Sequence, residues 1–138
     1  MAQSIRLRVV TPSRLLLDEE VEEVTAPGAL GEFGVLPDHI AFLSLLEPGE
    51  LSYRQGASRT YLAVRGGYAE VLDNTVTVLA DAAEFREEID VERAREARDG
   101  AERRMQQLNP DDPEYAAAQA VQRWAVVELR VANREGRK

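Results

Sequence analysis

Residues 27 to 39 read Pro27-Gly28-Ala29-Leu30-Gly31-Glu32-Phe33-Gly34-Val35-Leu36-Pro37-Asp38-His39. Three glycines at intervals of three allow positive φ angles and close backbone approach, while two prolines fix φ and remove hydrogen-bond donors. The stretch is therefore expected to form a shaped loop. A tight corner between two sheets, with His39 hydrogen-bonded in place, explains these residues. A partner protein that covers the apolar side chains explains them as well, and both interpretations stay open.

Short apolar segments on both sides of this loop indicate β-strands. Residues 5 to 9 alternate between apolar and polar, which is the period of a strand buried on one face. The continuous apolar run from Ile40 to Leu46 is interpreted as a strand buried on both faces. Hairpins are expected within residues 51–64 and 68–79 because turn residues separate alternating segments. Residues 1–86 are therefore predicted to form an antiparallel β-sandwich.

The pattern changes to a helical one in residues 87–138. Asp90 and Asp112 are good N-cap residues, and Pro113 suits the first helical position. Apolar residues, mostly alanine, recur at spacings of three and four: Ala94, Ala97, Ala101, Met105 and Leu108, then Tyr115, Ala118, Val121, Ala125, Leu129 and Ala132. Two helices with a short connection are predicted to form an antiparallel hairpin. Since alanine buries little area, we expect the hairpin to dock weakly and to move when a partner offers more surface.

Composition excludes several classes of function. The 138 residues include no cysteine and one histidine, so neither a disulfide, a thiolate nucleophile nor a usual zinc site is expected. Residues 1–89 carry 15 acids and 7 bases, and residues 90–138 carry 10 of each, so the whole net charge of −8 lies in the first part. Nucleic-acid binding is disfavoured because it needs a basic surface. No catalytic motif, signal peptide or membrane span is recognised, so membrane association is expected only through partners.

Several motifs, in the same order, resemble the epsilon subunit of bacterial F-type ATP synthases. They are Val9-Val10-Thr11-Pro12, Gly31-Glu32-Phe33-Gly34-Val35-Leu36-Pro37-Asp38-His39, Pro48-Gly49, Gly66-Gly67-Tyr68-Ala69-Glu70-Val71, Val76-Thr77-Val78-Leu79-Ala80 and Ile89-Asp90-Val91-Glu92-Arg93-Ala94. The resemblance covers the chain from end to end. It implies a non-catalytic central-stalk subunit that couples c-ring rotation to ATP synthesis and inhibits ATP hydrolysis through its C-terminal helices.

The resemblance also implies contact residues. Glu32 and Phe33 correspond to positions that meet the ring of c subunits, and Thr11, His39 and Ser44 to positions that meet the gamma subunit. Basic residues of the hairpin would approach the beta subunit, which forms the catalytic head with alpha: Arg98, Arg103, Arg104 and Arg130. The complex would place the chain, as a peripheral protein, at the cytoplasmic face of the inner membrane.

Some members of this family bind a regulatory ATP, and the corresponding positions here are Glu84, Ile89, Asp90, Arg93, Ala94 and Arg123. The pattern is incomplete, because one arginine of the nucleotide-binding members is replaced by Gly100 and another falls near Glu128. Without the resemblance, Asp90 is explained as a helix cap and Arg93 as a solvated charge. ATP would be regulatory only, and no cofactor is required.

An alternative from another class is a free-standing β-sandwich that binds a ligand or dimerises through its helices. Such a module would elute alone or as a homodimer, whereas a stalk subunit would co-purify with alpha, beta and gamma chains.

Overall fold

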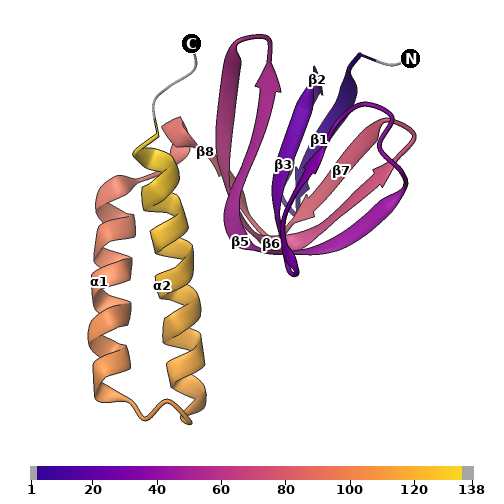
Figure 1. The fold of residues 1–138 in the computed structure, drawn as a ribbon. Helices are drawn as coiled ribbons and strands as arrows, with labels where there is room; N and C mark the ends of the chain where they lie inside the picture. The colour runs from indigo at the N-terminus through magenta and orange to yellow at the C-terminus, as the bar shows by residue number, and fades with distance from the viewer. Residues whose placement is uncertain (1–2, 135–138) are drawn as a thin grey trace.

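The computed structural model describes residues 3–134 as a β-rich unit followed by two helices (Figure 1). The strands are β1 (Ile5–Thr11), β2 (Arg14–Val21), β3 (Glu23–Gly28), β4 (Gly31–Val35), β5 (Phe42–Gln55), β6 (Ser58–Leu72), β7 (Thr75–Ala80) and β8 (Ala83–Phe85). A 3-10 turn, η1 (Arg86–Glu88), leads to α1 (Val91–Gln107) and α2 (Pro113–Ala132). The predicted fold class, a sandwich followed by a helical hairpin, is confirmed.

The strands form one sheet that folds over on itself, in the order β2-β1-β7-β6-β5-β3-β4, with β8 paired to β6 (Figure 1). The long strands β5 and β6 run through both layers. The end of β6 pairs with β7, while its beginning pairs with β8, and the end of β5 pairs with β3. Neighbouring strands are antiparallel except for β1 and β7, which are parallel. The parallel pairing joins β1, the first strand, to β7, which begins much later in the chain, at Thr75.

The bend between the layers lies on β6 at Gly66 and Gly67. Their φ angles are +75° and +109°, values that side chains strongly disfavour. A Cβ on Gly67 would also lie 2.0 Å from the carbonyl oxygen of Leu79. Glycine at this position therefore allows β6 to bend and β7 to approach closely.

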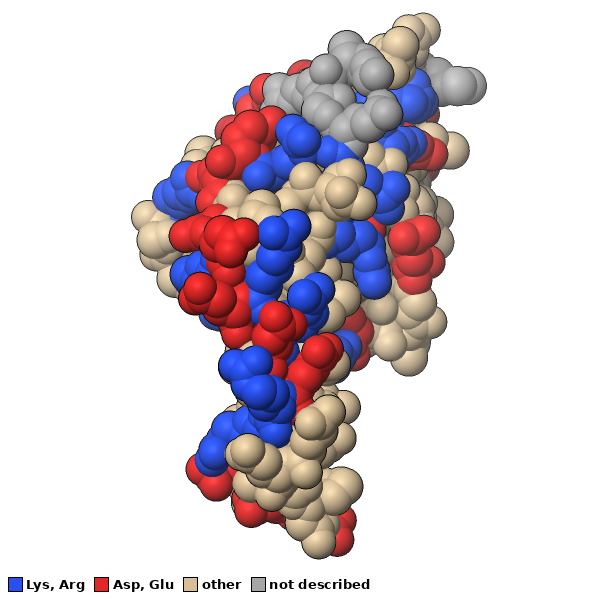
Figure 2. Space-filling model, turned by 90° about the vertical axis from the view of Figure 1, so that its left-hand side faces the viewer, with Lys and Arg blue, Asp and Glu red and all other residues tan. Residues whose placement is uncertain are grey.

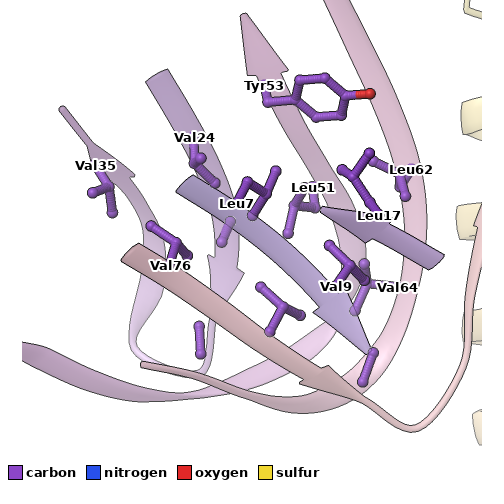
Figure 3. Packing of buried hydrophobic residues seen from close by; sticks show 14 of the residues in the cluster. Leu7, Val9, Leu17, Val24, Val35, Leu51, Tyr53, Leu62, Val64 and Val76 are labelled. Carbon is purple, nitrogen blue, oxygen red and sulfur yellow. The ribbon is translucent and has the colours of Figure 1, made fainter. Parts of the chain in front are cut away.

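The interior between the layers is apolar (Figure 3). Ile5, Leu7 and Val9 are at most 1% exposed, as their alternation predicted. They pack with side chains from the other strands, among them Leu17, Val24, Val35, Leu51, Tyr53, Leu62, Val64 and Val76. This core takes all its buried members from the sandwich, so the sandwich does not need the helices to bury its interior.

The prediction for residues 40 to 46 is wrong in one respect. The strand begins at Phe42 and only Leu46, at 7% exposure, is buried. Ile40, Leu43 and Leu45 are 78%, 70% and 64% exposed. The apolar run is continuous because one face meets the core and the other is an uncovered surface.

Both helices begin where the sequence predicts. The Asp90 carboxylate accepts a hydrogen bond from the Arg93 backbone, and the Asp112 carboxylate accepts one from the Glu114 backbone, with Pro113 at the first position. The alanine stripe is buried between the helices at four positions: Ala94, Ala101, Ala118 and Ala125. Neither helix has the length and apolar character that a membrane-crossing helix needs.

A second apolar cluster attaches the hairpin to the sandwich. Val127 and Val131 on α2 pack with Ala63 on β6 and with Ile89, while Trp124 and Tyr61 are half-buried beside them. The guanidinium of Arg134 lies 4.3 Å from the Tyr61 ring centre and donates two hydrogen bonds to the Glu50 carboxylate. The sandwich therefore holds the C-terminal half of α2.

Candidate functional site

An apolar row crosses five strands on the outer face of one layer. Cross-strand pairing joins the residues in sequence, from β5 to β6, β7, β1 and β2: Leu45, Tyr68, Leu79, Val10 and Leu15. We call these five residues the outer strip. Neighbouring strands are about 4.8 Å apart, so the strip is roughly 19 Å long.

The outer strip is open to solvent. Leu45, Tyr68, Leu79 and Leu15 are 64%, 49%, 46% and 51% exposed, and Leu43 extends the same face at 70%. A contiguous apolar surface of this kind marks a binding site for another protein more often than scattered apolar residues do. Sequence reasoning did not find this site. The signal was present, because Val9-Val10, Leu45-Leu46 and Val78-Leu79 place apolar residues on both faces of their strands.

The residues implied for the c ring lie on the edge strand β4, so the prediction that residues 27 to 39 form a loop is wrong for Gly31–Val35, where pairing with β3 accommodates the glycines. Glu32 is exposed, and Phe33 is half-buried against the sandwich core. The Phe33 ring meets the Phe42 ring edge-on at 5.1 Å between ring centres. The His39 ring also meets Phe42 edge-on, at 6.1 Å between ring centres. Packing therefore fixes Phe33 while the neighbouring carboxylate projects into solvent.

The residues implied for the gamma contact lie on three segments. Thr11 ends β1 directly after Val10 of the outer strip, and Ser44 lies on β5 next to Leu45. The His39 Nδ1 atom hydrogen-bonds the Ile40 carbonyl at 2.7 Å, in the loop before β5. Thr11 and Ser44 are thus next to the outer strip in the chain but point to the other face of their strands, and His39 contacts Phe42, the ring that also meets Phe33.

The implied beta-subunit contacts divide into two groups on the hairpin. Arg98 and Arg130 line one groove between α1 and α2, together with Arg95. Arg103 and Arg104 lie nearer the connection between the helices, where Arg104 pairs with Glu114 at 2.8 Å. Figure 2 shows arginine side chains interspersed with acidic ones along the visible face of the hairpin. The structure does not bring the four arginines together in one patch.

A cavity of about 420 Å³ opens between the helices and β6. Its walls are partly small and apolar, and its polar groups come from Arg65 on β6, Arg93 on α1 and Glu128 on α2. Trp124 forms another wall, with the Arg65 guanidinium 5.9 Å from its ring centre. The cavity therefore lies where β6, α1 and α2 meet.

Glu128 is only 4% exposed, which is unusual for a carboxyl group. Its carboxyl group hydrogen-bonds that of Glu84 on β8. Burial, followed by the hydrogen bond and the negative charge of Glu84, raises the pKa of Glu128 from its ordinary value of 4.5 to about 8, although Arg93 and Arg65 act in the opposite direction. The two acids consequently hold a proton at neutral pH.

The residues implied for ATP do not all line this cavity. Of the residues implied for the nucleotide, Arg93 and Ala94 line the cavity, but Ile89 is packed in the second apolar cluster and Asp90 caps α1. The Arg123 guanidinium pairs with Glu47 on the sandwich at 3.3 Å. Arg93 and Ala94 are therefore the only two of the six implied residues that line the cavity within the described part of the chain.

A β-sandwich with an exposed apolar strip, followed by a helical hairpin packed against it, is typical of a subunit that binds another protein. Residues 4–86 match the family ATP synthase, Delta/Epsilon chain, beta-sandwich domain, and residues 87–133 match ATP synthase, Delta/Epsilon chain, long alpha-helix domain. The chain belongs to the epsilon-chain family of the ATP synthases, and like its members it is a non-catalytic subunit.

Relatives resemble the chain over nearly its whole length. ATP synthase epsilon chain 2 of Syntrophotalea carbinolica is 48% identical over 99% of both chains. The epsilon chain of Syntrophobacter fumaroxidans is 52% identical over 97% of this chain and 99% of that one. A chain in the Euglena gracilis mitochondrial ATP synthase (OSCP/F1/c-ring) superposes with a TM-score of 0.82 at 26% identity, covering 97% of this chain and 84% of its own. These matches do not favour a free-standing module.

Proposed function

We propose that this stalk subunit docks on the gamma subunit through the outer strip and so turns with the rotor. The observation that carries this proposal is the row of exposed apolar side chains across five strands. Thr11 and Ser44, which the resemblance assigns to the same contact, are the chain neighbours of Val10 and Leu45, but consecutive strand residues point to opposite faces, so they add no side chain to the outer strip. His39, in the loop before β5, would meet gamma separately from the strip.

The loop and edge strand near Glu32 would contact the c ring. An exposed carboxylate can form an ion pair with basic side chains of the ring, and the packed Phe33 ring beside it limits the motion of this strand. The two contacts together would couple c-ring rotation to ATP synthesis in the alpha and beta head. The chain would then be held at the cytoplasmic face of the membrane by its partners.

The hairpin would restrain ATP hydrolysis by placing its basic residues near the beta subunit. Removing residues 90–138 is therefore expected to raise the ATPase rate of the assembled enzyme several-fold. The sandwich core has all its buried side chains within residues 5–83, so the shortened chain should still fold and assemble. The measurement is the steady-state ATPase rate of complexes with matched subunit content.

The same assay can distinguish the effect of the arginine charges from the effect of the hairpin as a whole. Changing Arg98, Arg103, Arg104 and Arg130 to alanine should reproduce part of the increase, whereas Arg8→Ala on β1, near Asp18, should not. An equal ATPase rate with and without the hairpin would remove the inhibitory role.

We further propose that ATP does not regulate this chain. Titration calorimetry with MgATP is expected to give no binding heat up to millimolar nucleotide, because Gly100 and Glu128 stand where the nucleotide-binding members have arginines and Arg123 pairs with Glu47. Each missing donor of this kind removes about 1.5 to 3 kcal/mol. A saturable heat with one site per chain, lost in Arg93→Ala, would contradict this proposal and restore the nucleotide site.

A further inference from the structure

The acid pair Glu84–Glu128 lies where the hairpin meets the sandwich. Glu84 belongs to β8, at the end of the sandwich, and Glu128 belongs to α2, 44 positions later in the chain (128 − 84). On α2, Glu128 follows Val127 and lies three positions before Val131. These two valines pack on Ala63 and Ile89. The pair is therefore part of the contact that holds α2 on the sandwich.

One oxygen of the pair has no hydrogen-bond partner, outside or inside the pair, within residues 3–134. The Glu84 Oε1 atom is buried and finds no hydrogen-bond partner among the described residues. Arg65 on β6 and Arg93 on α1 act on Glu128 through their charges, and both face it from the elements packed around α2. Both arginine side chains are largely exposed, so water weakens their effect on a carboxyl group that is itself buried.

We propose that Glu84 and Glu128 share one proton when the hairpin is docked, and that loss of this proton as the pH rises releases α2 from the sandwich. Two ionised carboxylates in contact repel each other, and a buried one also loses its hydration. Releasing α2 separates the charges and exposes them to water. The pair thus makes hairpin docking depend on protons. This device concerns the chain's own two parts and does not require that the hairpin restrain the ATPase.

The direction of the pH effect follows from proton linkage. In the released state Glu128 returns to its ordinary pKa of 4.5, whereas in the docked state its pKa is about 8. Docking is therefore strongest below about pH 4.5, weakens between the two values and reaches its lowest level above about pH 8. Within this window the docking equilibrium constant should fall about tenfold per pH unit, because docking takes up one proton.

The other contacts of the docked hairpin do not explain such a change. Arg134 with Glu50 and Arg123 with Glu47 are ion pairs between groups of opposite charge, so neither pair brings two acids together. The only histidine of the chain, His39, has its side-chain contacts with Ile40 and Phe42 on the sandwich. The Glu84–Glu128 pair is thus the group at this interface that a proton can switch.

Native-state hydrogen exchange of the full-length chain tests the proposal, because it measures even rare opening of α2. Protection of α2 amides, corrected for the intrinsic effect of pH, should fall about tenfold per pH unit between pH 5 and pH 8. Protection of β1 amides in the sandwich core should stay constant and so exclude global unfolding. Trp124, the only tryptophan, adjoins the same interface and should show a red-shifted emission whenever release becomes extensive.

Replacing either glutamate of the pair with glutamine removes its ionisable proton and keeps the size of the side chain. In Glu128→Gln an amide can donate the hydrogen bond that the shared proton provides, so α2 protection should become independent of pH. In Glu84→Gln the burial of Glu128 remains, so the pH range over which α2 protection falls should become narrower but should not disappear. Glu92→Gln is the matched control: Glu92 is an exposed acid of α1 that pairs with Arg95, and this variant should keep the wild-type slope. A flat profile in the wild type, or the wild-type slope in Glu128→Gln, would overturn the proposal.

Discussion

Replacing Leu45 and Leu79 together with glutamate is expected to weaken binding of the chain to the gamma subunit by at least a hundredfold. Both side chains lie in the outer strip, one on each side of Tyr68, and both are about half exposed or more. Fully burying an exposed leucine contributes about 1.5 to 3 kcal/mol, and since about half of each side chain is already covered, the two together contribute roughly 1.5 to 3 kcal/mol. Unpaired carboxylates in the interface add a further cost. The measurement is calorimetric titration of the purified gamma subunit.

The same variant should leave the sandwich folded, because neither side chain contributes to the interior. Its melting temperature and circular dichroism should match those of the wild-type chain. Val121→Glu is the matched control, since Val121 is 49% exposed on α2 and lies outside the strip. If the double variant bound gamma as tightly as the wild type, the outer strip would not be the gamma-binding surface.

Replacing Gly67 with alanine is expected to lower the free energy of unfolding by about 3 kcal/mol or more. The φ angle of +109° alone should cost about 1 to 3 kcal/mol for a residue with a side chain. The new Cβ would also lie 2.0 Å from the Leu79 carbonyl oxygen and 2.9 Å from the Ala80 Cα, so β6 and β7 would have to separate. Urea denaturation of the isolated chain measures the loss.

Gly56→Ala separates the cost of the positive φ angle from the cost of the close contact with β7. Gly56 also has a positive φ angle, +61°, but no atom lies within 4 Å of its added Cβ. Its replacement should cost about 1 kcal/mol, the ordinary penalty for the left-handed region. Equal losses in the two variants would show that the close approach of β7 to Gly67 does not constrain the fold.

Features encoded by neighbouring residues were predictable from the sequence. The N-caps Asp90 and Asp112 and the buried alternation of β1 depend on local geometry, so a single segment reveals each of them. The prediction of residues 40 to 46 was wrong because an apolar run looks the same whether its second face meets a core or a partner. Exposure is a property of the whole fold.

Features that join distant segments were not predictable in this way. The parallel pairing of β1 with β7 and the meeting of Glu84 with Glu128 each depend on how the sandwich closes and where α2 docks. Val127 and Val131 attach the hairpin, yet they lie off the alanine stripe that the helical period indicated. Even so, their spacing of four positions on α2 was a signal of a second apolar face.

The central claim is that this chain belongs to a rotor through an apolar surface on its sandwich. The most direct measurement is affinity capture of the tagged chain after gentle detergent extraction of membranes from its own cells, with the recovered proteins identified by mass spectrometry. We expect recovery with gamma, alpha, beta and c subunits, and loss of these partners in the Leu45 and Leu79 double variant. Recovery of the wild-type chain alone, or only as a homodimer, would contradict it.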